Sequence, residues 1–209
     1  MTSIDSLAAD PPRAVLRARR RRHLLAAAGE VFARQGYHAA TMDEIAHRAG
    51  FSKPTVYVQF PSKLALYLEV LQNHIDDLIE VVRTALRSTT GNRARVHAVV
   101  AAYFDFVDHN SVGYHLIFES DATIEPSVQW RVGNAIDACV TAAADLIAHD
   151  GDLDPFRARM LAVGMVGASR SGAAHWVESN REIPKAVAVR LTAELCWGGL
   201  AGIPLRDDM

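Results

Sequence analysis

A short segment near the N-terminus carries several side chains that can donate or accept hydrogen bonds. Two apolar residues accompany them: Val56 lies among them and Phe60 follows them. On a helix over about 53–59 these two would point inward and the polar groups would face outward. Such a helix can lie in the major groove and read base edges. The polar candidates are Ser52, Lys53, Thr55, Tyr57 and Gln59.

The residues before this segment predict a second short helix that would position it. Thr41-Met42-Asp43-Glu44 has the pattern of a capping box, which indicates a helix over about 42–49. Gly50 then makes a tight turn, and Pro54 is tolerated in the first turn of the next helix. Two short helices joined by such a turn predict a helix-turn-helix. An ordinary helix corner with solvated polar residues is the alternative.

Charge is distributed unevenly along the chain, although the net charge is only −2. Residues 11–60 hold nine basic and three acidic residues, a net charge of +6, whereas residues 61–209 carry −6. A basic front region favours contact with a polyanion, and a solvated basic terminus is the alternative. Phosphate or minor-groove contacts are predicted for Arg19, Arg20, Arg21, Arg22, Thr41 and Lys63.

Helical periodicity dominates the whole chain, and no segment alternates like a strand. We therefore predict an all-α fold of about nine helices: a three-helix helix-turn-helix domain followed by a helical bundle. The predicted domains are a disordered leader over 1–12, a DNA-binding domain over 13–60, and a ligand-binding and dimerisation domain over 61–209. Besides the two short helices, the predicted helices cover 13–35, 61–88, 93–109, 112–119, 126–149, 155–179 and 185–200.

Residues 27–63 closely resemble the DNA-binding domain of the TetR family of transcriptional regulators. The matching features are Phe32, the pair Gly36-Tyr37, the segment 41–50, the run Ser52-Lys53 before Thr55-Val56-Tyr57, and finally Phe60 and Lys63. The resemblance implies that Tyr57 and Lys63 bind phosphate with help from Thr41. It also implies that Lys53 and Thr55 lie nearest the bases. Pro54 and Gln59 stand where the family often has glycine and histidine.

Aromatic and polar residues gather in the middle of the chain, and they predict a small-molecule pocket between helices. An ordinary aromatic core is the alternative for each of them. The candidate ligand-binding residues are Tyr103, Phe104, Phe106, His109, His115, Phe118, Trp130, Asn134, Asp137, His175 and Trp176.

Two helices are rich in small residues, namely 155–179 and 185–200. Small residues allow close approach of helices, so these two are predicted to form a two-fold, four-helix interface in a homodimer. A buried helix pair within one subunit is the alternative. The resemblance also implies a dimer.

Several classes of protein are disfavoured. The longest uncharged stretch has eleven residues, too few for a membrane-spanning helix. Cys139 and Cys196 lie in apolar patterns, which favours reduced thiols and a cytoplasmic location. His109 and His115 could converge with Asp108 or Glu119, but no histidine pair has i,i+4 spacing, so no metal or other cofactor is expected. Recognised catalytic motifs are also missing, so the chain is not expected to be an enzyme.

These observations predict a homodimeric DNA-binding regulator. We expect a repressor that a small-molecule effector releases from a pseudo-palindromic double-stranded DNA operator. The alternative is a helical protein-interaction module without sequence-specific DNA binding, and Pro54 and Gln59 are the departures that permit it.

Overall fold

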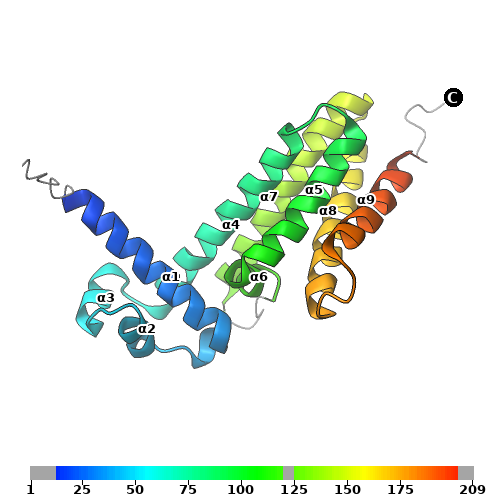
Figure 1. Ribbon diagram of the computed structural model, residues 1–209. Helices are drawn as coiled ribbons and strands as arrows, with labels where there is room; N and C mark the ends of the chain where they lie inside the picture. Colours follow the sequence, from blue (N-terminus) through cyan, green and yellow to red (C-terminus); the bar gives the residue numbers. More distant parts are fainter. Residues whose placement is uncertain (1–12, 120–124, 202–209) are drawn as a thin grey trace, which may run out of the picture. The chain divides into compact units, whose positions relative to one another are not determined.

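The computed structural model describes residues 13–119 and 125–201, and within these ranges the chain is all-α (Figure 1). The predicted leader over 1–12 lies outside the described residues. The helices are α1 (Arg13–Ala39), α2 (Met42–Arg48), α3 (Lys53–Gln59), α4 (Lys63–Arg87), α5 (Asn92–His109), α6 (Ser111–Ile117), α7 (Pro126–Gly151), α8 (Pro155–Glu178) and α9 (Lys185–Ala201). Every predicted helix is present, with ends displaced by only a few residues.

The chain divides into two compact units, residues 1–70 and 71–209. Helix α4 therefore begins in the first unit and ends in the second. The sequence placed the boundary ten residues earlier, at the start of this helix. None of the helices in the described ranges combines the length and apolar character that a bilayer-spanning segment requires.

The first unit has a core in which α1 packs on α2, and α2 on α3. Leu24, Val31, Ile45 and Val56 are completely buried there. The backbone leaves the helical conformation at Gly36, with φ 76° and ψ 168°, where the sequence predicts the end of the first helix. A positive φ of this size is accessible to glycine at little cost.

In the second unit, α8 packs against α5, α7 and α9, and α5 also contacts α9 (Figure 1). Ion pairs fix the start of α9 to α5, because Lys185 Nζ lies 2.8 Å from Asp105 Oδ1 and 2.9 Å from Asp108 Oδ2. The hydrogen bonds from Lys185 and Arg181 lower the pKa of Asp108 despite its partial desolvation. The α8–α9 connection is thus held against the bundle.

Candidate nucleic-acid interface and effector cavity

The turn between α2 and α3 is built from local hydrogen bonds. Thr41 Oγ1 accepts a bond of 3.2 Å from the Glu44 amide and caps α2. At the other end of α2 the Phe51 amide donates to the Ala46 carbonyl, and the Gly50 amide donates to the His47 carbonyl. These two bonds form a Schellman motif with Gly50 at φ 66°. The predicted helix-turn-helix geometry is therefore present.

The Glu44 carboxylate has a different role from the one that a capping box predicts. Its Oε1 atom accepts hydrogen bonds from Arg34 Nη2 at 2.7 Å and from Gln35 Nε2 at 2.6 Å, instead of returning to the Thr41 amide. Arg48 and Glu30 form a further ion pair between α2 and α1. Glu30 and Glu44 thus fix α2 onto α1.

Helix α3 and its N-cap residue expose five of their six predicted DNA-binding residues to solvent, and Val56 and Phe60 are buried as predicted. Ser52, Lys53, Pro54, Thr55 and Tyr57 are exposed, and Gln59 is half-buried. The hydroxyls of Ser52 and Thr55 lie 2.7 Å apart. Lys53 Nζ donates to Asp43 Oδ2 at 2.8 Å, and this hydrogen bond raises the pKa of the Lys53 ammonium. The helix thus offers a polar, exposed surface suited to a groove.

Sequence reasoning missed one residue on this helix, Val58. Its side chain is 86% exposed, although valine is normally buried. An exposed methyl-bearing side chain on a recognition helix can contact the C5-methyl group of thymine. The sequence did contain a signal: on a helix, Val58 lies two residues after the buried Val56 and therefore cannot share its face.

Lys63 lies in a site that differs from the predicted phosphate contact. Its ammonium donates to the main-chain carbonyls of Tyr37 at 2.7 Å, His38 at 3.1 Å and Ala40 at 2.9 Å. It also lies 4.5 Å from the centroid of the Tyr37 ring. An ammonium has three N–H donors, so a direct Lys63–phosphate bond requires one of these bonds to break. Lys63 stabilises the end of α1 in this conformation.

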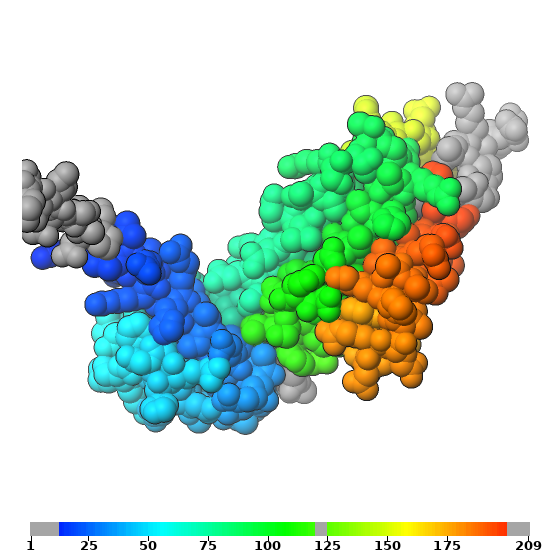
Figure 2. Space-filling view, in the orientation of Figure 1, coloured from blue at the N-terminus to red at the C-terminus, as the bar shows by residue number. Residues whose placement is uncertain are grey.

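The arginines of the predicted arm lie in the N-terminal half of α1, and the beginning of this helix extends away from the rest of its unit (Figure 2). Arg19, Arg20 and Arg22 are exposed. Arg21 differs from its neighbours, because its Nη2 atom lies 2.5 Å from Glu69 Oε1 and its guanidinium lies over the Phe60 ring. Three of the four arginines therefore expose their side chains to a polyanion, and Arg21 holds α1 against its own unit.

The structure does not bring the predicted ligand-binding residues around one cavity. Tyr103, Phe104, Phe106 and Trp176 are buried in the core of the second unit, where Phe104 and Trp176 are in contact. Phe118 stacks on Phe106, and His115 is paired with Glu119. Asp137 pairs with Arg159 at the surface. The predicted residues that are exposed there are His109, Trp130, Asn134, Asp137 and His175. A role for any of them in binding stays a prediction.

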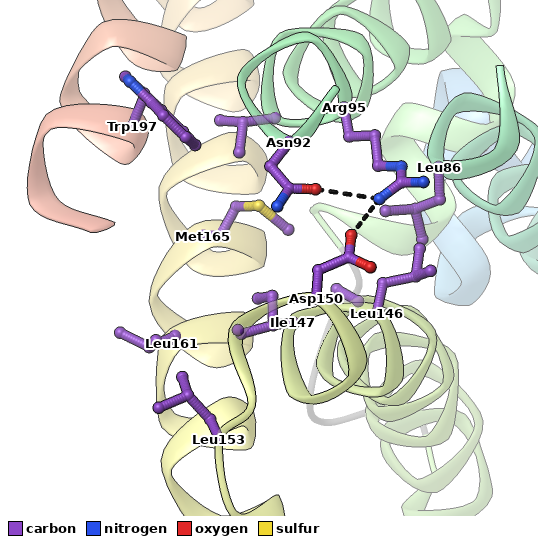
Figure 3. A pocket seen from close by; sticks show the side chains of 13 residues that line it. Leu86, Asn92, Arg95, Leu146, Ile147, Asp150, Leu153, Leu161, Met165 and Trp197 are labelled. Atoms are coloured by element: carbon purple, nitrogen blue, oxygen red, sulfur yellow. Dashed lines mark hydrogen bonds and ion pairs between the residues drawn. The ribbon is translucent and has the colours of Figure 1, made fainter. Parts of the chain in front are cut away.

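A cavity of about 290 Å³ lies elsewhere in the second unit, between α5, α7, α8 and α9 (Figure 3). Most of its lining is apolar, with Leu146, Ile147, Leu161, Met165 and Trp197 among the contributors. Its volume is near the lower end for small-molecule sites. None of the ligand-binding residues predicted from the sequence lines this cavity.

One side of the cavity is polar. Arg95 forms an ion pair with Asp150, donates to Asn92 Oδ1 at 3.0 Å and donates through Nε to the Thr89 carbonyl at 2.9 Å. Figure 3 shows these groups together, with Leu153 and Leu161 on the opposite side. Among the described residues, no group of three His, Cys, Asp or Glu side chains could hold a metal ion. The arrangement is suited to an organic ligand with an apolar body.

Comparisons with known proteins agree with this architecture. The sequence model described as "Bacterial regulatory proteins, tetR family" matches residues 24–70. The HTH-type transcriptional activator FasR of Mycolicibacterium smegmatis is 54% identical over 186 residues, which are 89% of this chain and 85% of FasR. The HTH-type transcriptional repressor KstR2 of Rhodococcus jostii is 33% identical over 98 residues, 46% of this chain and 48% of KstR2.

Solved structures share the fold. A TetR-like transcriptional regulator from Rhodococcus sp. RHA1 aligns with a TM-score of 0.67 at 27% identity, covering 92% of this chain and all of that one. The transcriptional regulator FadR of Bacillus subtilis, solved in complex with stearoyl-CoA, aligns with a TM-score of 0.73 at 16% identity. That alignment covers 86% of this chain and 98% of FadR.

Proposed function

The chain belongs to the TetR family of transcriptional regulators, which are not enzymes. From that premise we propose that it acts as a homodimer on a pseudo-palindromic operator, and that a small molecule in the second unit controls its DNA affinity. The observation that carries the proposal is the exposed polar face of α3, held by a capped helix-turn-helix and accompanied by exposed arginines on α1.

Base contacts are assigned to Lys53, Thr55 and Val58, because these side chains are exposed on α3. Thr41, Ser52 and Tyr57 carry hydroxyl groups that suit phosphate oxygens. Arg19, Arg20 and Arg22 supply charge for phosphates or for the minor groove. In this proposal α3 enters the major groove with its N-terminal residues toward the bases.

Dimerisation through α8 and α9 is supported by apolar side chains that the single chain leaves exposed. On α8, Phe156 is 74% and Met160 is 60% exposed, and on α9, Leu195 is 71% exposed. A shallow depression lined by Met160, Gly164, Leu195 and Gly199 lies along the same two helices. Exposed apolar surface of this kind marks interaction sites, and a two-fold axis would place both helices against their copies.

Leu195→Glu tests this interface, because it places a charge on the exposed apolar face of α9. Sedimentation of this variant should give a monomer where the wild type gives a dimer. Val81→Glu on α4 introduces the same charge at an exposed valine and should leave the dimer intact. Dimers of both variants, or monomers of the wild type, would contradict the proposed assembly.

Effector control requires that the ligand bind two conformations with different affinity. Helix α4 begins at Lys63 beside α1 and ends at Arg87, and Leu86 in its last turn lines the cavity. In the proposed mechanism, a ligand in the cavity changes the conformation of this helix and thereby the spacing of the two recognition helices.

The direction of regulation has two candidates. The sequence favours a repressor that its effector releases. The relative of 54% identity carries the name of an activator, so activation is the second candidate. Transcription in vitro from the chain's own promoter region distinguishes them: added protein lowers the transcript if it represses and raises it if it activates.

DNA binding is tested by footprinting and gel-shift titration on the intergenic DNA beside the chain's own gene. Thr55→Val should weaken the specific complex by about tenfold, in the range of one lost base contact. Arg19→Ala should weaken binding to all sequences and reduce the salt slope by about 0.9. A chain that forms no competition-resistant complex at moderate salt would instead be the protein-interaction module.

A further inference from the structure

The polar side of the α5–α7 cavity is asymmetric. Arg95 is held by two acceptors besides Asp150, namely the Thr89 carbonyl and Asn92 Oδ1. The Asp150 carboxylate accepts a hydrogen bond only from Arg95 within the described ranges. Arg95 therefore keeps its position if Asp150 leaves, whereas Asp150 has no second partner that would hold it.

Asp150 also occupies an unfavourable place along its helix. It lies in the last turn of α7, which ends at Gly151. The helix dipole disfavours a carboxylate at a C-terminus and favours a cation there. The ion pair with Arg95, whose side chains are 19% and 24% exposed, offsets this repulsion. The pair is thus open to competition by another anion.

The volume and the apolar lining of the cavity indicate the size and polarity of the competing anion. The void of about 290 Å³ is roughly ten times the volume of about 30 Å³ that one water occupies in the liquid. Its walls opposite Arg95 are aliphatic or aromatic (Figure 3). Nη2 of Arg95 has no hydrogen-bond partner among the described residues, so two N–H donors remain available.

We propose that this cavity binds an amphipathic anion, whose carboxylate or phosphate takes Arg95 from Asp150 and whose apolar body fills the void. The ligand class is an unbranched or compact apolar body of about ten non-hydrogen atoms with one anionic oxygen headgroup. Release of Asp150 frees the end of α7 and the α7–α8 turn. The inference rests on the proposed function only in treating this ligand as the effector.

The test titrates the purified full-length protein with four probes that share a decyl chain or its ten-carbon length: decanoate, decyl phosphate, decanol and decyltrimethylammonium. Calorimetry gives the affinities, and the emission of Trp197, which lines the cavity, reports occupancy. We expect the two anions to bind at least tenfold more tightly than decanol or the cation, since a charged hydrogen bond contributes that much. The better of the two anions identifies the headgroup.

Two substitutions should act in opposite directions. Arg95→Gln should weaken decanoate binding about tenfold, the loss of one charged hydrogen bond. Asp150→Asn removes the competing carboxylate and should tighten binding several-fold, which a merely structural role would not do. Arg93→Gln, at an exposed position on the same helix, is the matched control. Trp197→Phe should abolish the emission change while leaving the calorimetric affinity in place.

Equal binding of decanol and decanoate would overturn the inference, and so would weaker binding in both the Arg95 and the Asp150 variants. The inference would also be overturned if none of the four probes bound. The gel shift is measured separately on the same protein. If the protein shifts the operator but does not bind decanoate, the proposed function is supported and this inference is contradicted. If the probes bind as predicted but the protein forms no DNA complex, the proposed function is contradicted and this inference is supported.

Discussion

The Nζ atom of Lys53 lies 2.8 Å from Oδ2 of Asp43, so an ion pair joins the first residue of α3 to the first turn of α2. Both side chains are more than half exposed. An exposed pair of this kind contributes little to stability. In the proposed complex, the carboxylate competes with the DNA for Lys53, the lysine that is assigned to a base contact.

Asp43→Asn should therefore tighten DNA binding. Lys53 becomes available to the DNA, and one negative charge is removed from the binding face. We expect the salt slope to steepen by about 0.9, which corresponds to one more phosphate neutralised. Gel-shift titrations at several salt concentrations measure both quantities. Asp145→Asn, an exposed position on α7, serves as the control, and an equal gain there would contradict the proposed competition.

Substitution of Val58 should affect the specificity of DNA binding without affecting the stability of the fold. Its side chain is 86% exposed, so Val58→Ala should leave the melting temperature nearly unchanged. If Val58 packs on a thymine methyl, the loss of two methyl-sized groups at about 0.8 kcal/mol each should weaken operator binding roughly tenfold. Binding to random DNA should stay the same. Loss of specific and non-specific binding to the same extent would show that Val58 does not read a base.

Lys63 should act on stability. Lys63→Met removes three charged hydrogen bonds to carbonyls at the end of α1. We expect the free energy of unfolding to fall by about 2–3 kcal/mol, at the low end for several such bonds. Urea denaturation measures this change. Lys53→Met, which loses only an exposed ion pair, should cost less than about 1 kcal/mol. Similar losses in the two variants would refute the anchoring role.

His74 should make the second unit sensitive to acid. Burial lowers the pKa of His74 from its ordinary 6.5, with a smaller opposing effect of Asp77. The Asn110 amide donates to Nδ1 at 3.1 Å, which requires a neutral ring. The unfolded chain therefore binds a proton near pH 6.5 that the folded chain does not, so the free energy of unfolding falls as the pH drops below 6.5.

The measurement is urea denaturation at pH 7, 6 and 5. His74→Gln should flatten the decline of stability between pH 7 and pH 5. His97→Gln, an exposed histidine on α5, should retain the wild-type slope. An unchanged slope in the His74 variant would assign the acid sensitivity to other groups.

Local patterns were sufficient to predict the helices and the helix-turn-helix. The Thr41 cap, the positive φ of Gly36 and Gly50, and the buried Val56 and Phe60 all follow from residue types within a few positions. The Asp154 cap of α8 is a further example, since its Oδ1 accepts from the amides of Phe156 and Arg157.

Contacts between residues far apart in the chain could not be predicted from the sequence. Lys63 meets carbonyls more than 20 residues earlier, and Arg95 meets Asp150 across 55 residues. The spacing of charges along a chain does not reveal such partners. Composition also does not separate a pocket from a core, because aromatic residues suit both. The buried Tyr103 and Phe104 illustrate this, and the cavity is instead lined largely by aliphatic side chains.

The central claim is that α3 reads an operator from within a dimer. Footprinting of the wild type and of Thr55→Val on the intergenic DNA beside the gene tests it most directly. For the wild type we expect two protected half-sites, with centres separated by about 34–36 Å or a multiple of it. Thr55→Val should need about tenfold more protein for the same protection at an unchanged melting temperature. Protection of no fragment even at low salt, or half-protection by both proteins at the same concentration, would contradict the claim.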